Sequence, residues 1–167
     1  MSTATAERLE EDVALSDAFS AYRLAFARNF LLDFITTTYP KYQVKWYHEL
    51  LCKKCDDLLA GKIKKLMVFM SPQRGKSEIV SRRLPAFALG KNPALKIAAC
   101  SYSADLAEKF NREVQRIISD EVYAELFPST RLNNKNVVSD SNGSWLRNSS
   151  IFETVDYAGA YRAVGVM

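Results

Sequence analysis

The sequence has little of several features that mark specialised classes of protein. Its 167 residues include three cysteines, one histidine and six glycines, which excludes a disulfide-rich secreted scaffold. No window reaches the roughly 18 apolar residues that a membrane helix needs, and the N-terminus is acidic, unlike a secretion leader. We therefore expect a cytoplasmic protein with reduced thiols and no contact with a membrane.

The chain does have an ordinary globular composition, with charge distributed unevenly along it. Hydrophobic residues make up 48% and charged residues 25%, which indicates one folded domain or slightly more. The net charge is +4, yet residues 1–20 hold five acids and one arginine, so the remainder is strongly basic. A local basic cluster suits DNA phosphates, although solvated helix faces carry similar runs. It comprises Lys53, Lys54, Lys62, Lys64 and Lys65.

The most informative stretch runs from Leu66 to Glu78, where an apolar segment leads through a polar turn into Gly-Lys-Ser. We interpret it as a strand, a phosphate-binding loop and a helix start, because successive N–H groups and a helix N-terminus present positive potential to an anion. Gly75 lets the backbone approach phosphates, Lys76 reaches the β- and γ-phosphates, and the Ser77 hydroxyl ligates Mg²⁺. The pattern therefore predicts a nucleotide site.

The loop departs from the usual pattern G-x-x-x-x-G-K-[ST] at one position, because Met70 stands where the first glycine is expected. The alternative is a strand-turn-helix connection that contains Gly-Lys-Ser by coincidence. The apolar run before the loop and the helical periodicity after it favour the phosphate-binding interpretation.

His48, Cys52 and Cys55 share one face of a predicted helix, at positions i, i+4 and i+7. A structural zinc site normally needs four ligands, and the remaining cysteine, Cys100, falls in a buried-looking strand. We therefore expect core or surface roles for these residues.

Periodicity predicts helices that alternate with two parallel strands. After a frayed acidic tail at 1–15, the first helix carries an aromatic stripe that we assign to the core, namely Phe19, Tyr22, Phe26, Phe30 and Phe34. Pro85 is expected to kink or end the helix after the loop, and Ser103 to cap the next helix. The expected elements are helices at about 16–37, 43–59, 77–84 with a continuation to 89, and 103–118, and strands at 66–70 and 96–100.

The C-terminal part departs from this alternation. Residues 136–139 and 144–147 flank Asn142-Gly143, which favours a hairpin with a type I′ turn. A short strand at 151–155 is expected to follow. The chain then reaches Met167 through an apolar segment without a cap or a solvating tail, so we expect a fragment of a longer domain.

Several motifs, taken in order, resemble the large terminase subunit of tailed bacteriophages and prophages. The resemblance spans about residues 40–167 and is carried by Met70–Ser81, Pro85-Ala86, Leu89–Pro93 and Ser101–Ala107. It implies an α/β fold: a three-layer P-loop NTPase domain of the RecA/ASCE type, with helices on both faces of the sheet. Residues 1–60 would form an N-terminal helical lid on the adenine side, and residues 61–167 the front half of the ATPase domain.

The resemblance also implies roles for individual residues, with ATP and Mg²⁺ as ligands. The segment resembles the family's modified Walker A loop, in which the first glycine is often replaced. Tyr42 to His48 resemble the region that contacts adenine, which makes Gln43 a candidate for reading the base, whereas helix packing is the simpler role for Trp46 and Tyr47. Nucleotide contacts are implied for Ser71, Pro72, Gln73, Arg74, Gly75, Lys76, Ser77 and Glu78, catalytic roles for Lys76 and Arg74, and the Mg²⁺ contact for Ser77.

Two of the implied functional roles have an alternative interpretation. Arg74 could sense the γ-phosphate of its own nucleotide or a neighbouring subunit. Ser101-Tyr102-Ser103 resembles a motif that can face DNA in related motors, but it is also an ordinary helix cap.

The sequence lacks a second acidic motif, an apolar strand ending in Asp-Asp or Asp-Glu that would hold magnesium and polarise the attacking water. The resemblance therefore implies a chain truncated before the Walker B strand, without the nuclease domain, and unable to hydrolyse ATP at a useful rate.

In the complete family protein, ATP powers the packaging of double-stranded viral DNA into procapsids in the cytoplasm of the bacterial host. The implied partners are that DNA, the portal protein, the small terminase subunit and further copies in a homo-oligomeric ring. Two other interpretations stay open: a prophage remnant or split-gene fragment that binds nucleotide or a partner, and another P-loop protein such as a helicase-like ATPase or a kinase.

Overall fold

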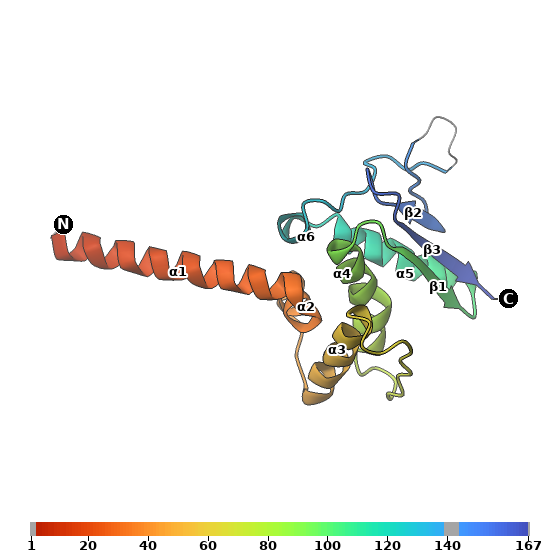
Figure 1. Ribbon diagram of the computed structural model, residues 1–167, viewed down its shortest axis with the longest axis horizontal. Coiled ribbons are helices and arrows are strands. Elements are labelled where there is room, and N and C mark those ends of the chain that lie inside the picture. The colour runs from red at the N-terminus through yellow and green to blue at the C-terminus, as the bar shows by residue number, and fades with distance from the viewer. Residues whose placement is uncertain (1–2, 139–143, 167) are drawn as a thin grey trace.

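The computed structural model describes residues 3–138 and 144–166. Figure 1 shows a long helix projecting from a body in which helices pack beside a small sheet, so the α/β class is confirmed. In chain order the elements are α1 (Thr3–Asn29), α2 (Leu31–Thr38), α3 (Trp46–Leu59), the π-helix η1 (Glu78–Arg83), α4 (Leu84–Lys91), β1 (Lys96–Ser101), α5 (Ala104–Ile118), α6 (Glu121–Leu126), β2 (Ile151–Glu153) and β3 (Ala160–Gly165).

The N-terminal segment differs from the prediction in two respects. The residues predicted to be a frayed tail are helical from Thr3, and the predicted single helix breaks at Phe30, whose φ of −123° and ψ of 133° are extended. The aromatic stripe is not core either: Phe19, Tyr22, Phe26 and Phe30 are exposed, and of the five predicted residues Phe34 alone is buried. The periodicity identified a helix correctly, but no element of the described chain packs against this face of it.

The core lies where α2, α4 and α6 meet. Phe34 of α2 contacts the rings of Phe87 and Tyr123, with centroids 5.3 Å and 6.0 Å away, and Phe127 closes the cluster. The Tyr123 hydroxyl donates a 2.8 Å hydrogen bond to the Ala86 carbonyl, which satisfies its one buried polar group. The sequence pattern does not predict a helix at 121–126, so this side of the core is found only in the structure.

Pro85 does not end the helix that follows the loop. The chain forms a π-helix up to Arg83, in which the Leu84 N–H donates to the Ile79 carbonyl, and then continues as α4. Proline has no N–H to donate, and the wider turn just before it absorbs the change in hydrogen bonding. The irregularity expected at this proline is therefore present as a π-to-α transition.

The sheet has the order β1-β3-β2, with β1 parallel and β2 antiparallel to β3. Residues Lys96–Ser101 confirm the predicted strand at 96–100, and their partners are Ala160 to Gly165, a strand that the sequence analysis missed. Helix α5 packs against β3 and β1, and its cap is the predicted one, because Ser103 Oγ accepts from the Leu106 N–H at 3.3 Å.

The predicted strand at 66–70 is wrong. The segment is extended but pairs with no strand of the described chain, and β1 pairs with β3 instead. Its side chains alternate: Leu66, Val68 and Met70 pack against the core, whereas Met67 and Phe69 are 78% and 86% exposed. An apolar pattern of period two indicates a strand, but it does not supply the neighbouring backbone that a strand needs.

The predicted hairpin is described in part. Val137 and Arg147 exchange two backbone hydrogen bonds of 2.9 Å and 3.0 Å as an isolated antiparallel bridge. The expected turn at Asn142-Gly143 lies outside the described residues. The predicted strand at 151–155 is present as β2. No helix within 3–138 or 144–166 combines the length and the apolar character that crossing a membrane requires.

Candidate functional site

The loop at 71–77 connects the extended segment 66–70 to the start of η1. Two of its residues adopt left-handed backbone conformations, Gln73 with φ of 59° and Gly75 with φ of 82°. Ser71, Pro72, Gln73, Arg74, Lys76 and Ser77 are exposed, whereas Gly75 and Glu78 are half-buried. The chain therefore turns sharply at the half-buried Gly75, and the other residues of the loop are exposed to solvent.

Gly75 cannot be replaced by a larger residue without displacing its neighbours. A Cβ built there would lie 2.7 Å from the Tyr42 hydroxyl and 2.9 Å from Nε2 of His48. Its positive φ also disfavours L residues with a side chain. The glycine predicted to let phosphates approach is thus required on the inner side of the loop, where it packs against α3 and the segment before it.

His48, on the first turn of α3, holds the loop through its backbone. Its Nδ1 accepts a 3.2 Å hydrogen bond from the Lys45 N–H, so the proton resides on Nε2, which donates to the Arg74 carbonyl at 2.9 Å. The side chain is 5% exposed. In the sequence, His48 is a doubtful metal ligand and the last residue of the segment that resembles the adenine-contacting region, and no sequence pattern signals that a buried histidine will bind a loop carbonyl.

Tyr42 completes the inner wall of the loop. Its ring lies 5.1 Å from that of His48, and its hydroxyl is buried without a hydrogen-bond partner in the described chain. Burial raises the pKa of Tyr42 to about 12, with a smaller contribution from nearby acidic groups. Gln43 follows directly in sequence, but it is exposed and precedes α3, so its predicted place inside that helix is wrong. Tyr42 and His48, at the two ends of the segment that precedes the loop in sequence, both lie against Gly75 of the loop.

The outer side of the loop offers unused hydrogen-bond donors. Among the described residues, none accepts a hydrogen bond from the backbone N–H groups of Gln73 through Ser77. Lys76 and Ser77 are exposed on the turn that leads into η1. Consecutive N–H groups without an acceptor in the described chain, a helix N-terminus and a lysine are features that phosphate-binding loops combine.

Glu78 belongs to an ion-pair network behind the loop. Its carboxylate accepts from Arg82 at 2.6 Å and from Arg83 at 2.8 Å. Arg82 also contacts Glu113 of α5. Burial alone would raise the pKa of Glu78, but the hydrogen bonds and charges of Arg83 and Arg82 outweigh it and hold that pKa below the ordinary value. In this structure the carboxylate faces the helix, so Glu78 fixes the start of η1.

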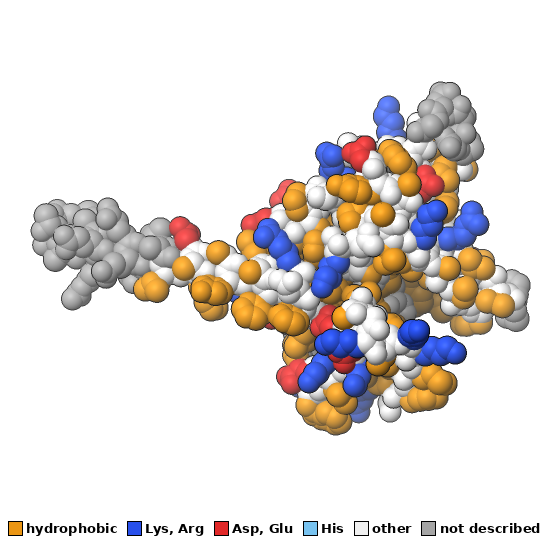
Figure 2. Space-filling view, viewed as in Figure 1, with side chains coloured by type: hydrophobic (Ala, Val, Ile, Leu, Met, Phe, Trp, Pro, Cys, Tyr) orange, Lys and Arg blue, Asp and Glu red, His pale blue; other side chains and the backbone are white. Residues whose placement is uncertain are grey.

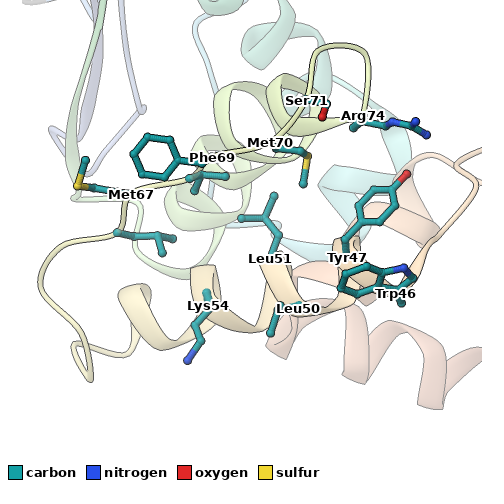
Figure 3. A pocket seen from close by; sticks show the side chains of 12 residues that line it. Trp46, Tyr47, Leu50, Leu51, Lys54, Met67, Phe69, Met70, Ser71 and Arg74 are labelled. Carbon is teal, nitrogen blue, oxygen red and sulfur yellow. The ribbon is translucent and has the colours of Figure 1, made fainter.

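A hollow of about 500 Å³ lies beside the loop, between α3 and the extended segment (Figure 3). Trp46 and Tyr47 stand at one end below Ser71 and Arg74, while Met67 and Phe69 stand at the other. Trp46 is 74% exposed, which contradicts the helix-packing role expected for it. The lining is mainly apolar and aromatic, with Lys54 at the rim.

The predicted roles of the cysteines and of the basic cluster can be compared with their surroundings. Cys52 and Cys55 are buried free thiols, and burial raises their pKa values to about 12 and about 11. In the part of the chain that the structure describes, no group of three His, Cys, Asp or Glu residues could hold a metal ion. Figure 2 shows lysines and arginines mixed with acids around α3, where Asp57 pairs with Lys54 and Lys62 at 3.8 Å and 3.3 Å.

Comparison with known proteins identifies one family. Residues 67–163 match the family described as "Terminase large subunit, T4likevirus-type, N-terminal". The matched region begins in the extended segment before the loop and ends within β3, so it contains the loop, η1, α4, β1 and α5. No curated protein and no solved structure matches the chain.

Proposed function

Because the chain belongs to the N-terminal family of T4-like terminase large subunits, we propose that it forms the nucleotide-binding part of a motor that packages viral DNA. In this proposal the loop at 71–77 binds the phosphates of ATP with Mg²⁺. In this proposal residues 61–167 correspond to the front half of a domain of the RecA/ASCE type.

The observation that carries the proposal is the two-sided structure of the loop. On its inner side Gly75 packs against Tyr42 and His48, with no room for a Cβ. The N–H groups of Gln73 to Ser77 donate to no acceptor in the described chain. A loop held this firmly, with its donors unused, is preorganised for an anion and loses little entropy on binding.

Individual roles follow from position. Lys76 would contact the β- and γ-phosphates, and Ser77 would ligate Mg²⁺ at the start of the helix. Arg74, exposed at the rim, would reach the γ-phosphate of its own nucleotide or the site of a neighbouring copy. Gln43 would contact the base, and the aromatic hollow bounded by Trp46 and Tyr47 supports a place for a planar ring beside the loop.

Hydrolysis is not part of the proposal for these 167 residues. No apolar strand of the described chain ends in paired acids, and β3, where the family match ends, carries no carboxylate. A second metal-binding carboxylate is what positions the attacking water in such sites. We propose that the chain binds ATP without turning it over, and that double-stranded DNA, the portal protein, the small subunit and other copies join it in the bacterial cytoplasm.

Calorimetric titration with ATP and Mg²⁺ tests the proposal. The wild-type chain should bind, and Lys76→Ala should weaken binding by at least about tenfold, because one charged contact to phosphate is lost. Lys109→Ala is the matched control, since Lys109 is an exposed lysine on α5. Equal affinities for the wild type and Lys76→Ala would refute the site, and robust phosphate release dependent on Lys76 would refute the absence of hydrolysis.

A further inference from the structure

Helix α1 carries an unpartnered apolar stripe outside everything that the proposed function uses. Its side chains are described from Leu15 onward, and four large apolar ones recur at intervals of three and four residues, Leu15, Phe19, Tyr22 and Phe26, while Phe30, directly after the helix, continues the spacing. At 100° per residue these positions fall within one narrow arc of the helix. Their exposed fractions are 68%, 67%, 68%, 50% and 48%.

Most of the stripe faces away from the body of the protein, and only Phe30 at its end also lines a hollow beside α3. The opposite side of α1 is the one that packs: Ala27 is buried, Leu24 is half-buried, and Arg28 donates to the Leu126 carbonyl at 3.0 Å. Figure 1 shows the helix projecting clear of the helices and sheet. A continuous aromatic face of this length on a projecting helix is a contact surface rather than a core element.

The spacing of the stripe identifies its partner. Reversed end to end, the stripe falls on itself: Leu15 comes opposite Phe30, Phe19 opposite Phe26, and Tyr22 near its own copy. A second, antiparallel α1 therefore matches each apolar side chain with another, in the isologous arrangement of a two-fold dimer. We propose that α1 pairs with α1 of a second copy of this chain in antiparallel orientation.

Charge along the helix selects this orientation. Residues 3–17 contain five acids and one arginine, whereas residues 18–29 contain Arg23 and Arg28 and no acid. Parallel pairing would place the two acid-rich halves side by side, and like charges at close range are destabilising. Antiparallel pairing with Leu15 opposite Phe30 keeps the two acid-rich halves at opposite ends and sets Asp17 of each copy opposite Arg28 of the other. Helix α1 lies outside the residues that match the family, so the family match says nothing about this surface.

Sedimentation of the purified chain at micromolar to submillimolar concentration tests the pairing. The wild type should dimerise, and the double change Phe19→Ser and Phe26→Ser should weaken the dimer by at least about tenfold. The matched control is Ala21→Ser with Ala25→Ser, which changes exposed positions of α1 off the stripe. A monomeric wild type, or equal association of the stripe variant and the control, would overturn the proposal. Unchanged thermal melting of both variants shows that folding is intact, because neither phenylalanine belongs to the core.

Disulfide trapping tests the orientation. In a Cys100→Ser background, Leu15→Cys and Phe30→Cys are made as separate chains, and each is oxidised alone and mixed with the other. The antiparallel pair predicts a cross-linked dimer mainly in the mixture, because a disulfide needs Cβ atoms about 4 Å apart. Efficient cross-linking of Leu15→Cys with itself would show a parallel pair and overturn the proposal. Neither the sedimentation test nor the disulfide test uses nucleotide, so the outcomes of both are independent of ATP binding.

Discussion

The two flanks of the phosphate loop are held in different ways. After the loop, η1 and α4 are fixed by the ion pairs of Glu78 and by a fully buried set that includes Ile79, Phe87 and Leu89. Before it, the segment 66–70 makes no strand pairing in the described chain, and Phe69 is 86% exposed. The conformation of this loop therefore depends mainly on its contacts with the helix that follows it and with α3, and less on the segment that precedes it.

The largest expected effect is a difference in folding stability between the same substitution on the two flanks. Phe87→Ala should lower the free energy of unfolding by about 3 to 5 kcal/mol, because it removes a buried ring from the contact with Phe34 and Phe127. Phe69→Ala, an identical change on the other flank, should alter it by no more than about 0.5 kcal/mol. Urea unfolding of both variants measures the difference. Similar losses would show that the front segment is packed as firmly as the helix.

Gly61 and Gly75 both have a positive φ, so replacing each with alanine distinguishes the cost of backbone strain from the cost of crowding. Gly61→Ala, with φ of 71° and open space around it, should cost about 1 to 2 kcal/mol of folding free energy for the left-handed conformation alone. Gly75→Ala pays the same strain, and its Cβ also meets Tyr42 and His48, so it should cost about 1 to 3 kcal/mol more and abolish ATP binding. Equal costs in urea unfolding would contradict the close packing inferred at Gly75.

His48 links α3 to the loop, and its loss should loosen the loop without dismantling the core. His48→Phe keeps a ring but leaves the Lys45 N–H and the Arg74 carbonyl unpaired, at a cost of about 1 to 3 kcal/mol. Affinity for ATP should fall with it, because the loop is less preorganised. The neighbouring exposed change Glu49→Gln serves as control for both measurements. Wild-type affinity in His48→Phe would show that the hydrogen bond does not shape the site.

The smallest expected effect is a pH dependence from Glu78. Its pKa is lower in the folded chain than in the unfolded one, so its contribution to stability is present above the unfolded value of about 4.5 and is lost as pH falls through the folded value. Glu78→Gln should remove this part of the acid sensitivity and lower stability at neutral pH. Urea midpoints of both proteins between pH 3 and pH 7 measure it. Parallel curves would show that Glu78 titrates as an ordinary exposed acid.

The sequence predicted local features better than their partners. The strand at 96–100 and the Ser103 cap depend on residues close together in sequence, and the structure confirms both, whereas the phosphate-binding role of the loop at 71–77 stays a prediction. The strand at 66–70 and the burial of Phe19 to Phe30 failed because both required knowledge of what lies opposite. Amphipathic patterns indicate which face seeks a partner, but not whether this chain provides one.

The inner wall of the site could not be predicted for the same reason. The contacts of Tyr42 and His48 with Gly75 join residues far apart in sequence, and their chemistry is that of ordinary core side chains. The resemblance placed the segment from Tyr42 to His48 near the nucleotide, but it pointed to the exposed Gln43 rather than to the two buried rings that support the loop.

If the loop at 71–77 binds nucleotide, its N–H groups must donate hydrogen bonds to phosphate. Amide chemical shifts of ¹⁵N-labelled protein during titration with ATP and Mg²⁺ test it most directly, because each donor is observed separately. We expect the largest shifts at Gln73 to Ser77, with saturation at one ligand per chain and none of these shifts in Lys76→Ala. Shifts confined to the lysines of α3 and the segment after it, or no saturable change at the loop, would contradict it.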